Sequence, residues 1–345
     1  MSATIGIGVV GFWHVHAVDY AGLAARNPAT ELVSGWDADA GLAETGTAEL
    51  GIENAGSLDE LLADPRIDAV TVTTETSEHT AVITRALLAD KHVFAEKLLA
   101  PTAAEAEQLT QLATERGRAL VTSLPRLSEP ATVTARALIA AGALGEITFA
   151  RVRLAHDGWL KNWLPERFAD PAAALGGALT DLGCHPVYLV QQFLGSDPTT
   201  VSATYGAFTE RPVEDNAVVT LRYRNGAIGV AEAGFVSGVG SFSFEIHGST
   251  GSLLYGFGNA HLVGKGGALG EDWAEIGLAP AAPQPFELWV DAIGRAPSTA
   301  SDPNTTGDRT LAENATAAIE LTRLVNAAGE SAATGASVDY QKAQS

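Results

Sequence analysis

Apolar and polar residues alternate with the period of a strand or of a helix along the first 123 residues. Short apolar, β-branched runs typical of buried strands occupy residues 4–11, 31–37, 67–74, 91–97 and 118–123. Apolar residues at helical spacing lie between them, in residues 16–28, 40–51, 57–65, 77–90 and 102–117. Regular alternation of this kind predicts a doubly wound parallel sheet with helices on both faces.

The pattern changes after residue 123. One helical segment, residues 131–145, precedes strands in series at residues 147–156, 199–208, 216–235 and 241–256. Asn225-Gly226 is a strong signal for a two-residue hairpin turn. A last helix, residues 311–329, is expected to pack back on these strands. The predicted fold class is α/β, with a nucleotide-binding type of sheet in residues 1–123 and an α+β domain with a large, mainly antiparallel open sheet in residues 124–345.

Composition limits the partners and the compartment. The length of 345 residues suits two domains. The 41 acidic against 21 basic residues give a formal charge of −20, which disfavours nucleic acid and anionic lipid as partners. Cys184 is the single cysteine in the sequence, so no intramolecular disulfide can form. With no basic leader and no apolar run near the roughly 18 residues that span a bilayer, we expect a cytoplasmic protein.

The stretch "IGIGVVGFWHVHA", residues 5–17, reads as a strand, a glycine turn and the start of a helix. In a dinucleotide-binding turn, three glycines permit the bend, the approach of the pyrophosphate and the packing of the helix. Here Trp13 takes the second of these positions and His16 the third. The helix N-terminus can still supply N–H donors to a pyrophosphate. A turn that binds no ligand is the alternative. The candidate cofactor contacts in this stretch are Gly8, Gly11, Phe12, Trp13 and His14.

Asp37 ends the second predicted strand, 26 positions after Gly11. An acidic residue at this place binds the adenosine ribose hydroxyls in such folds. Asp39 adds a second negative charge, and no Arg or Lys lies nearby to accept a 2′-phosphate. The pattern favours NAD over NADP, and a simple turn aspartate is the alternative.

His14 and His16 raise the question of a metal ion. On a helix, side chains two residues apart point away from each other, and no Cys or His cluster follows in the sequence. We therefore expect no metal site.

Two further motifs carry candidate chemistry. Glu96 and Lys97 end a predicted parallel strand, at the sheet edge where ligands bind in open α/β folds. Asp181 and His185 are four residues apart on a probable helix, which would place both side chains on one face. Both could contact one substrate, or the carboxylate could orient the imidazole.

In their order and spacing these motifs resemble the Gfo/Idh/MocA family, which includes glucose–fructose oxidoreductase and inositol dehydrogenase. Residues 70–97 resemble its strand, TP loop, histidine, helix and EKP segment. Residues 176–185, "GGALTDLGCH", resemble its GGxxxDxGxH segment, and residues 244–255 a strand–turn–strand of its second domain. The resemblance implies an N-terminal Rossmann domain, bound NAD(P), a sugar or cyclitol substrate, and a homodimer or homotetramer formed through the open sheet face.

The resemblance also assigns roles to residues. It implies that Lys97, Asp181 and His185 are catalytic, and that the cofactor is further contacted by Thr73, Thr74, His79, Glu96 and Lys97. Four positions depart from the family pattern: Trp13 replaces a glycine, Thr74 and Leu98 replace prolines, and Tyr188 stands where an aspartate is frequent.

The expected reaction is the transfer of a hydride between a secondary alcohol of a sugar, sugar derivative or cyclitol and the nicotinamide. His185 would take the hydroxyl proton, because its ordinary pKa lies near working pH. Lys97 would stabilise the developing alkoxide, and Asp181 would orient His185 or bind a neighbouring hydroxyl.

Residues 156–168, "HDGWLKNWLPERF", are expected to line the substrate pocket. Aromatic rings can stack on sugar C–H faces, and cations can bind hydroxyls or an anionic group. Packing of the aromatic rings at a domain junction is the alternative. With the catalytic residues Lys97, Asp181 and His185, the substrate-binding candidates are Arg126, Trp159, Lys161, Trp163 and Arg167.

Two other functions stay open on the same fold. One is a glycoside hydrolase or lyase in which NAD is recycled through a transient keto-sugar with no net redox change. The other is a ligand sensor without catalysis, which the presence of Lys97, Asp181 and His185 disfavours.

Overall fold

The computed structural model describes residues 4–258, 260–294 and 306–340. The chain forms two compact units, the first made of residues 1–123 and 283–322 and the second of residues 124–282 and 323–345. The chain passes from the first unit to the second after Ser123, where we placed a domain boundary. Residues 283–322, which we assigned to the C-terminal domain, instead belong to the first unit.

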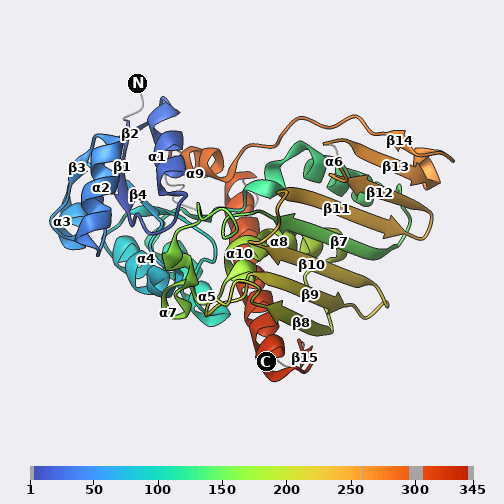
Figure 1. The fold of residues 1–345 in the computed structure, drawn as a ribbon. Coiled ribbons are helices and arrows are strands. Elements are labelled where there is room, and N and C mark those ends of the chain that lie inside the picture. The colour runs from blue at the N-terminus through green and yellow to red at the C-terminus, as the bar shows by residue number, and fades with distance from the viewer. Residues whose placement is uncertain (1–3, 259, 295–305, 341–345) are drawn as a thin grey trace. The chain divides into compact units, whose positions relative to one another are not determined.

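The first unit contains a six-stranded, wholly parallel sheet with the strand order β3-β2-β1-β4-β5-β6 (Figure 1). The order reverses between β1 and β4, which is the switch point where open α/β sheets bind ligands. The predicted doubly wound sheet is confirmed. Its strands are β1 (Ile5–Val10), β2 (Thr30–Trp36), β3 (Glu53–Asn54), β4 (Ala69–Val72), β5 (His92–Ala95) and β6 (Leu120–Thr122).

Helices cover both faces of this sheet, because strands such as β1, β4 and β6 are buried on both sides. The helices of the first 123 residues are α1 (Ala17–Arg26), α2 (Ala40–Leu50), α3 (Leu58–Ala63), α4 (His79–Leu88) and α5 (Ala103–Arg116), with a short 3₁₀ turn η1 (Thr76–Glu78). One core cluster joins Val70, Val72 and Val93 of the strands to residues of α3, α4 and α5. A second joins Ile5 and Ile7 to residues of α1 on the opposite face.

The second core cluster explains why the chain returns to the first unit near its end. Helix α9 (Pro285–Gly294) places Phe286 and Trp289 against Phe94 of β5, with ring centroids 5.4 Å and 5.6 Å from it. Trp289 Nε1 donates a hydrogen bond of 3.3 Å to the Ala119 carbonyl. Without α9 these apolar side chains on one sheet face would be exposed to water. The long helix α10 (Thr306–Thr334) contributes Ala318 to the other face.

The second unit contains a nine-stranded sheet with the order β14-β13-β12-β11-β7-β10-β9-β8-β15 (Figure 1). All neighbours are antiparallel except β10 and β7, so the predicted mainly antiparallel sheet is confirmed. The strands are β7 (Ile147–Ala155), β8 (Thr200–Gly206), β9 (Asn216–Arg222), β10 (Ile228–Gly234), β11 (Ser241–Gly248), β12 (Gly251–Tyr255), β13 (Leu262–Gly266), β14 (Ala274–Glu275) and β15 (Val338–Asp339). The predicted hairpin joins β9 and β10, but its turn spans residues 224–226 and not two residues, because the Tyr223 N–H donates to the Ala227 carbonyl. Within it only Gly226 has a positive φ, of +88°.

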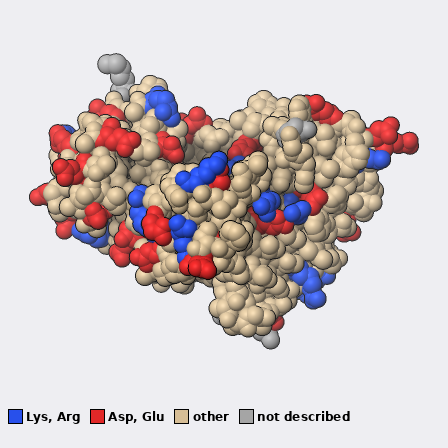
Figure 2. Space-filling view, viewed as in Figure 1, with Lys and Arg blue, Asp and Glu red and all other residues tan. Residues whose placement is uncertain are grey.

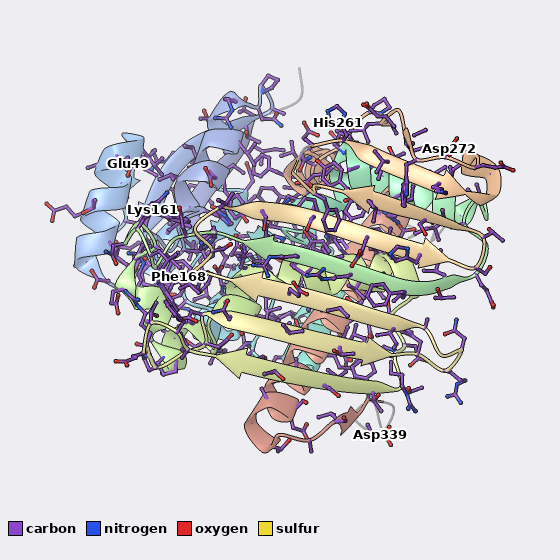
Figure 3. The ribbon with its side chains drawn as sticks, turned by 45° about the vertical axis from the view of Figure 1, so that its right-hand side comes forward. Glu49, Lys161, Phe168, His261, Asp272 and Asp339 are labelled. Atoms are coloured by element: carbon purple, nitrogen blue, oxygen red, sulfur yellow. The ribbon has the colours of Figure 1, made fainter. Side chains whose placement is uncertain are left out.

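One face of this sheet is covered and the other is not. Helix α8 (Cys184–Leu194) is almost wholly buried and packs on β7 and β10. Figure 3 shows no helix of the described chain over the opposite face of the sheet. On that face, Arg151 and Arg153 pair with Glu232. The remaining helices are α6 (Pro130–Ala140) and α7 (Pro171–Ala174), with 3₁₀ turns η2 (Pro125–Ser128), η3 (Glu166–Ala169) and η5 (Gly267–Leu269) and a π-helical turn η4 (Leu179–Gly183).

Charged side chains of both signs lie on the surface (Figure 2). On the face drawn in Figure 2, Lys and Arg side chains form small groups among acidic ones. In the part of the chain that the structure describes, no helix has both the length and the apolar character needed to cross a membrane.

Candidate active site

Gly11 forms the turn between β1 and α1. Its φ is +91°, and a Cβ at this position would lie 2.4 Å from the Thr74 nitrogen and 2.7 Å from the Thr73 carbonyl carbon. Only glycine fits this conformation and this space. Thr73 Oγ1 donates to the Gly11 carbonyl at 2.6 Å, and the His14 N–H donates to the Thr73 carbonyl at 3.0 Å. The turn is thereby fixed to the end of β4 at the switch point.

Two of the predicted cofactor contacts serve the packing of this unit. Gly8 lies inside β1, where a Cβ would be 2.9 Å from a methyl group of Leu61. The Phe12 ring fills space against Gly35 and Gly46, where added Cβ atoms would lie 2.8 Å and 2.2 Å from it. These two residues give the turn its position, and their contact with a cofactor stays a prediction.

Asp37 follows β2 and is buried. Its Oδ2 accepts from the Phe12 N–H at 2.5 Å, and its Oδ1 accepts from the Asp39 N–H at 2.8 Å. Asp39 in turn caps α2 through the N–H groups of Gly41 and Leu42. Asp37 therefore holds the turn from the next strand, which supports the turn-aspartate interpretation. Its predicted ribose-binding role is compatible with the same location.

The switch point contains features that fit a bound dinucleotide. Thr74 Oγ1 is buried and has no hydrogen-bond partner among the described residues, which is unusual for a buried hydroxyl. It lies beside Gly11, whose missing side chain lets the Thr73–Thr74 backbone pack directly against the turn. Trp13 is buried in the same turn, with its ring centroid 6.4 Å from that of His14. An unsatisfied donor, a glycine turn and the Asp37 carboxylate together are the groups that such a cofactor needs.

Glu96 and Lys97 follow β5 and are buried, 1% and 4% exposed. Lys97 Nζ lies 3.1 Å from Glu96 Oε1 and 3.4 Å from His14 Nε2. Burial alone would raise the pKa of Glu96, but the charges of Lys97, His14 and His16 and the hydrogen bond from His16 outweigh it, so the pKa of this carboxyl lies well below its usual range. Glu96 is therefore an anion that holds the Lys97 ammonium.

Tyr20 completes this cluster from α1. Its hydroxyl donates to Glu96 Oε2. Burial, followed by the negative charge of Glu96, raises the pKa of Tyr20 well above its ordinary value. The phenol stays neutral and acts as a hydrogen-bond donor to the carboxylate.

His14 and His16 lie in the turn before α1, so our argument that they diverge on a helix is wrong. Their ring centroids are 4.5 Å apart. His16 Nδ1 is 3.0 Å from Glu96 Oε2, and His14 Nδ1 is 3.9 Å from the same oxygen. Among the described residues, these three side chains each offer one metal-ligand atom, all within 4.8 Å of one another.

His79 is wholly buried and joins two strand-end loops. Its Nδ1–H donates to the Leu98 carbonyl at 2.6 Å, and its Nε2 lies 3.3 Å from the Thr74 carbonyl. Burial lowers the pKa of His79. The neutral imidazole thus positions the residues after β4 and β5, and its predicted cofactor contact is untested.

In the second unit, Asp181 lies in the π-helical turn η4 and His185 in α8. The two residues lie on one continuous helical segment, as predicted, but its first turn is π-helical and not α-helical, which changes the angle between successive side chains. Their placement on one face stays a prediction. Asp181 is half-buried and His185 is buried, 6% exposed.

Tyr188 is a site residue that the sequence marked only as a departure from the family pattern. Its hydroxyl oxygen lies 2.9 Å from His185 Nδ1 and accepts from the Arg126 N–H at 3.1 Å. Burial raises the pKa of Tyr188 well above its ordinary value, so it is a neutral hydroxyl. Tyr188, at the position where the family often has aspartate, therefore contacts His185.

Glu214 is a second residue that the sequence analysis missed. Its carboxylate accepts from the N–H groups of Gly177 and Leu179, each at 2.9 Å. A Cβ on Gly177 would lie 2.0 Å from the Glu214 carbonyl oxygen, so the two segments are in close contact. Burial raises the pKa of Glu214 despite these hydrogen bonds. Nothing near Glu214 in the sequence signals this role.

The predicted substrate loop is divided between packed and exposed side chains. Trp159 is buried against Phe235, and the Arg211 guanidinium lies 4.8 Å from the centroid of its ring. This supports the packing alternative for Trp159. Trp163 is 51% exposed and donates to Asp157, which also pairs with Lys161 at 2.6 Å (Lys161 is labelled in Figure 3).

The two candidate arginines differ in their surroundings. Arg126 pairs with Glu129 at 3.0 Å, and its guanidinium lies 4.2 Å from the centroid of the Phe242 ring. Arg167 is half-buried in η3. Their contact with a substrate stays a prediction.

A switch-point glycine turn, a buried acidic residue after β2 and a buried ammonium after β5 define an NAD-binding oxidoreductase fold, and comparison with known proteins identifies its family. Residues 5–123 match the GFO/IDH/MocA oxidoreductase family with its NAD-binding Rossmann fold, and residues 132–254 match the C-terminal domain of that family. The chain belongs to the GFO/IDH/MocA family, as its sequence motifs predicted. The predicted oxidoreductase class and NAD as cofactor are confirmed with it.

Individual relatives agree with this assignment. The chain is 29% identical over 265 residues to scyllo-inositol 2-dehydrogenase (NAD(+)) of Bacillus subtilis, covering 74% of this chain and 73% of the relative. It is 32% identical over 236 residues to 1,5-anhydro-D-fructose reductase of Ensifer adhaerens, covering 67% and 70%. An inositol dehydrogenase homologue from Azotobacter vinelandii, solved with NAD+, superposes with a TM-score of 0.80 at 25% identity, covering 99% and 98% of the two chains.

Proposed function

We propose that this protein uses NAD to oxidise a secondary alcohol of a sugar, a sugar derivative or a cyclitol, with Lys97, Asp181 and His185 as its catalytic residues. The observation that carries the proposal is the buried Lys97 ammonium, held 3.1 Å from Glu96 at the ligand-binding edge of the Rossmann sheet. A buried ammonium needs a compensating anion, here Glu96, and an ionisable group buried at a ligand-binding edge is a candidate functional residue. The names of the relatives, inositol dehydrogenase and anhydrofructose reductase, support the substrate class.

The residues of the switch point would hold the cofactor. N–H groups at the start of α1 would face the pyrophosphate and Asp37 the ribose, and Thr74 Oγ1 would gain the partner that it lacks. When bound, NAD supplies the hydride acceptor. The protein supplies position and charge.

Lys97 would act on the reacting oxygen. An ammonium beside an anionic carboxylate keeps its proton, so it donates a hydrogen bond to the alcohol oxygen and stabilises negative charge there as the hydroxyl proton leaves. Glu96 fixes the position of Nζ, and His14 Nε2 lies 3.4 Å from it.

His185 would accept the hydroxyl proton at Nε2. This requires that Nδ1 carries the hydrogen and donates it to the Tyr188 oxygen, 2.9 Å away. The Tyr188 oxygen has two lone pairs, of which the Arg126 N–H uses one, so it has room for this second bond. Tyr188 thereby favours the tautomer that leaves Nε2 basic, and Asp181 would bind a neighbouring hydroxyl or help to orient the ring.

The substrate loop and the assembly complete the proposal. Of the substrate-binding candidates, Lys161 and Trp163 are exposed, and Trp159, Arg126 and Arg167 are buried or half-buried. We also propose a cytoplasmic homodimer or homotetramer formed through the open face of the nine-stranded sheet. Exposed Val218 and Ile228 on adjacent strands of that face support it.

The test is NADH formation across a panel of inositols, anhydrosugars and aldoses, with Lys97→Met as the decisive variant. Loss of an electrostatic stabiliser should lower kcat about 10³-fold. Lys91→Met is the matched control, because Lys91 lies at the opposite end of β5 and bonds only backbone carbonyls in the described structure. Cleavage of a glycoside without net NADH would identify the hydrolase or lyase alternative, and bound NAD with no turnover of any panel member would favour a sensor.

A further inference from the structure

Three side chains that can bind a metal ion lie close together in the first unit, two from the turn before α1 and one from the end of β5. The proposed function does not require all three together. We propose that His14, His16 and Glu96 bind a divalent transition-metal ion, and that this ion competes with the Lys97 ammonium for Glu96. The site lies entirely in the first unit, since its residues come from the β1–α1 turn and the end of β5.

The distances are close to those of a coordination sphere. Zinc lies about 2.0–2.2 Å from nitrogen and oxygen ligands, so two ligand atoms of one ion are about 3–4 Å apart. Here His16 Nδ1 and His14 Nδ1 lie 3.0 Å and 3.9 Å from Glu96 Oε2. Small side-chain movements would place all three ligand atoms around one ion.

The chemistry of the ligands selects the kind of ion. Two imidazoles and one carboxylate suit Zn²⁺ or Co²⁺, whereas Ca²⁺ and Mg²⁺ prefer oxygen ligands alone. The His16 backbone N–H donates to His14 Nδ1 at 3.2 Å, so in that arrangement the nitrogen carries a lone pair. An ion at Nδ1 would replace this weak hydrogen bond. The Tyr20 hydroxyl on Glu96 orients the carboxylate, as outer partners of metal ligands do.

Lys97 is the competitor, because its ammonium is the cation that the cluster holds in this structure. Its Nζ lies 3.1 Å from Glu96 Oε1 and 3.4 Å from His14 Nε2. A divalent ion on the other carboxylate oxygen would repel this ammonium across a few ångströms of buried space. Metal binding should therefore strengthen when the charge of Lys97 is removed, and this direction distinguishes a specific site from adventitious binding to exposed histidines.

The consequence for catalysis rests on the proposed function. If the Lys97 ammonium stabilises the reacting oxygen, an ion that displaces it from Glu96 inhibits the enzyme, and a chelator restores the activity. Metal affinity itself does not depend on that role.

The test is calorimetric titration of the full chain with Zn²⁺ after treatment with a chelator, together with the absorption spectrum of the Co²⁺-loaded protein. We expect one ion per chain, about tenfold or greater weakening in His16→Gln and His14→Gln, and about tenfold tightening in Lys97→Met. His261→Gln is the control, because His261 pairs with Glu275 at 2.7 Å on the surface and offers the same ligand types. His16 has a side chain 35% exposed, so its variant should fold, which a melting curve verifies.

The outcomes separate this site from the proposed function. Absence of stoichiometric Zn²⁺ binding, or binding that His14→Gln and His16→Gln leave unchanged, overturns the site even when the enzyme forms NADH. Zn²⁺ binding that follows the predicted order of variants supports the site even when no panel substrate is oxidised.

Discussion

The candidate sites of the two units compensate their buried charges in different ways. In the first unit, Glu96 faces a full positive charge on Lys97, and the pKa of Glu96 lies well below its usual range because this and the charges of His14 and His16 outweigh burial. In the second unit, Glu214 accepts hydrogen bonds from backbone N–H groups, and burial, with a smaller contribution from the negative charge of Asp215, raises its pKa. His185 likewise faces the neutral hydroxyl of Tyr188.

This difference predicts how much stability each site loses when one of its residues is substituted. The buried Lys97 ammonium is paired with the Glu96 carboxylate, and a buried charge loses most of its stabilisation when its partner is removed. A group compensated by dipoles has its stabilisation distributed over several smaller hydrogen bonds. We expect substitutions in the first site to cost more than those in the second.

Glu96→Gln tests this difference with the largest expected effect. It leaves the buried Lys97 ammonium without its anion, which should lower the free energy of unfolding by about 3–5 kcal/mol. Chemical denaturation of the full chain measures the change. The double variant Glu96→Gln with Lys97→Met should recover much of the loss, because neither charge then remains. A cost below about 1 kcal/mol in the single variant would show that the ammonium is not held by charge.

Glu214→Ala probes the second site. It leaves the Gly177 and Leu179 N–H groups without their acceptor, at an expected cost of about 2–3 kcal/mol. Glu214→Gln keeps one carbonyl acceptor and should cost about half as much. Hydrogen exchange at the two amides, compared between these variants, measures the effect locally. Equal exchange in all three proteins would mean that the carboxylate does not position this segment.

Most of the fold could be predicted from the sequence because many strands, helices and turns are indicated by their own residues. Strand β1, which ends just before Gly11, is apolar throughout, and the left-handed turn at Gly11 lies where the motif places it. The Asn225-Gly226 hairpin also depends only on its own residues and their neighbours. Glu96 and Lys97 could be predicted as site residues because they directly follow a parallel strand, and ligands bind at the carboxyl ends of such strands.

What the sequence did not reveal depends on contacts between distant segments. Helix α9 joins the first unit because Phe94 needs a covering helix on its sheet face, and no residue near 285 signals this. Glu214 contacts Gly177 across 37 positions. The π-helical turn around Asp181 is invisible to helical spacing, since the same apolar pattern fits an α-helix.

Tyr188→Phe sharpens the comparison at His185. The ring keeps its packing but loses the hydroxyl, so Nδ1 loses the partner that fixes its tautomer. We expect kcat to fall about tenfold with little change in KM, and the pH profile of kcat to shift. Tyr223→Phe is the matched control, because its hydroxyl donates to the Gly195 carbonyl at 2.9 Å and has no part in the proposed site. Equal activity of both variants would exclude a positioning role for Tyr188.

His92, also in the first unit, differs from Glu96. At Glu96 the neighbouring positive charges act against the effect of burial on the pKa, whereas at His92 a neighbouring positive charge acts in the same direction as burial. Its Nδ1 accepts from the Ala119 N–H at 2.9 Å, and an Arg118 guanidinium nitrogen lies 3.4 Å from Nε2. Burial, and after it the Arg118 charge, lowers the pKa of His92 to about 4.

The unfolded chain therefore takes up a proton near the ordinary pKa of 6.5 that the folded chain refuses until about pH 4. Stability should fall as pH drops through this window and change no further below it. A shift is worth about 1.4 kcal/mol per pKa unit, and partial exposure of the ring reduces the expected loss to about 1 kcal/mol. His92→Gln should remove this part of the acid dependence in denaturation series at pH 7, 5 and 4, whereas His261→Gln should keep it. If both variants retain the full slope, the imidazole is already protonated in the folded protein, and the contrast with Glu96 is one of degree only.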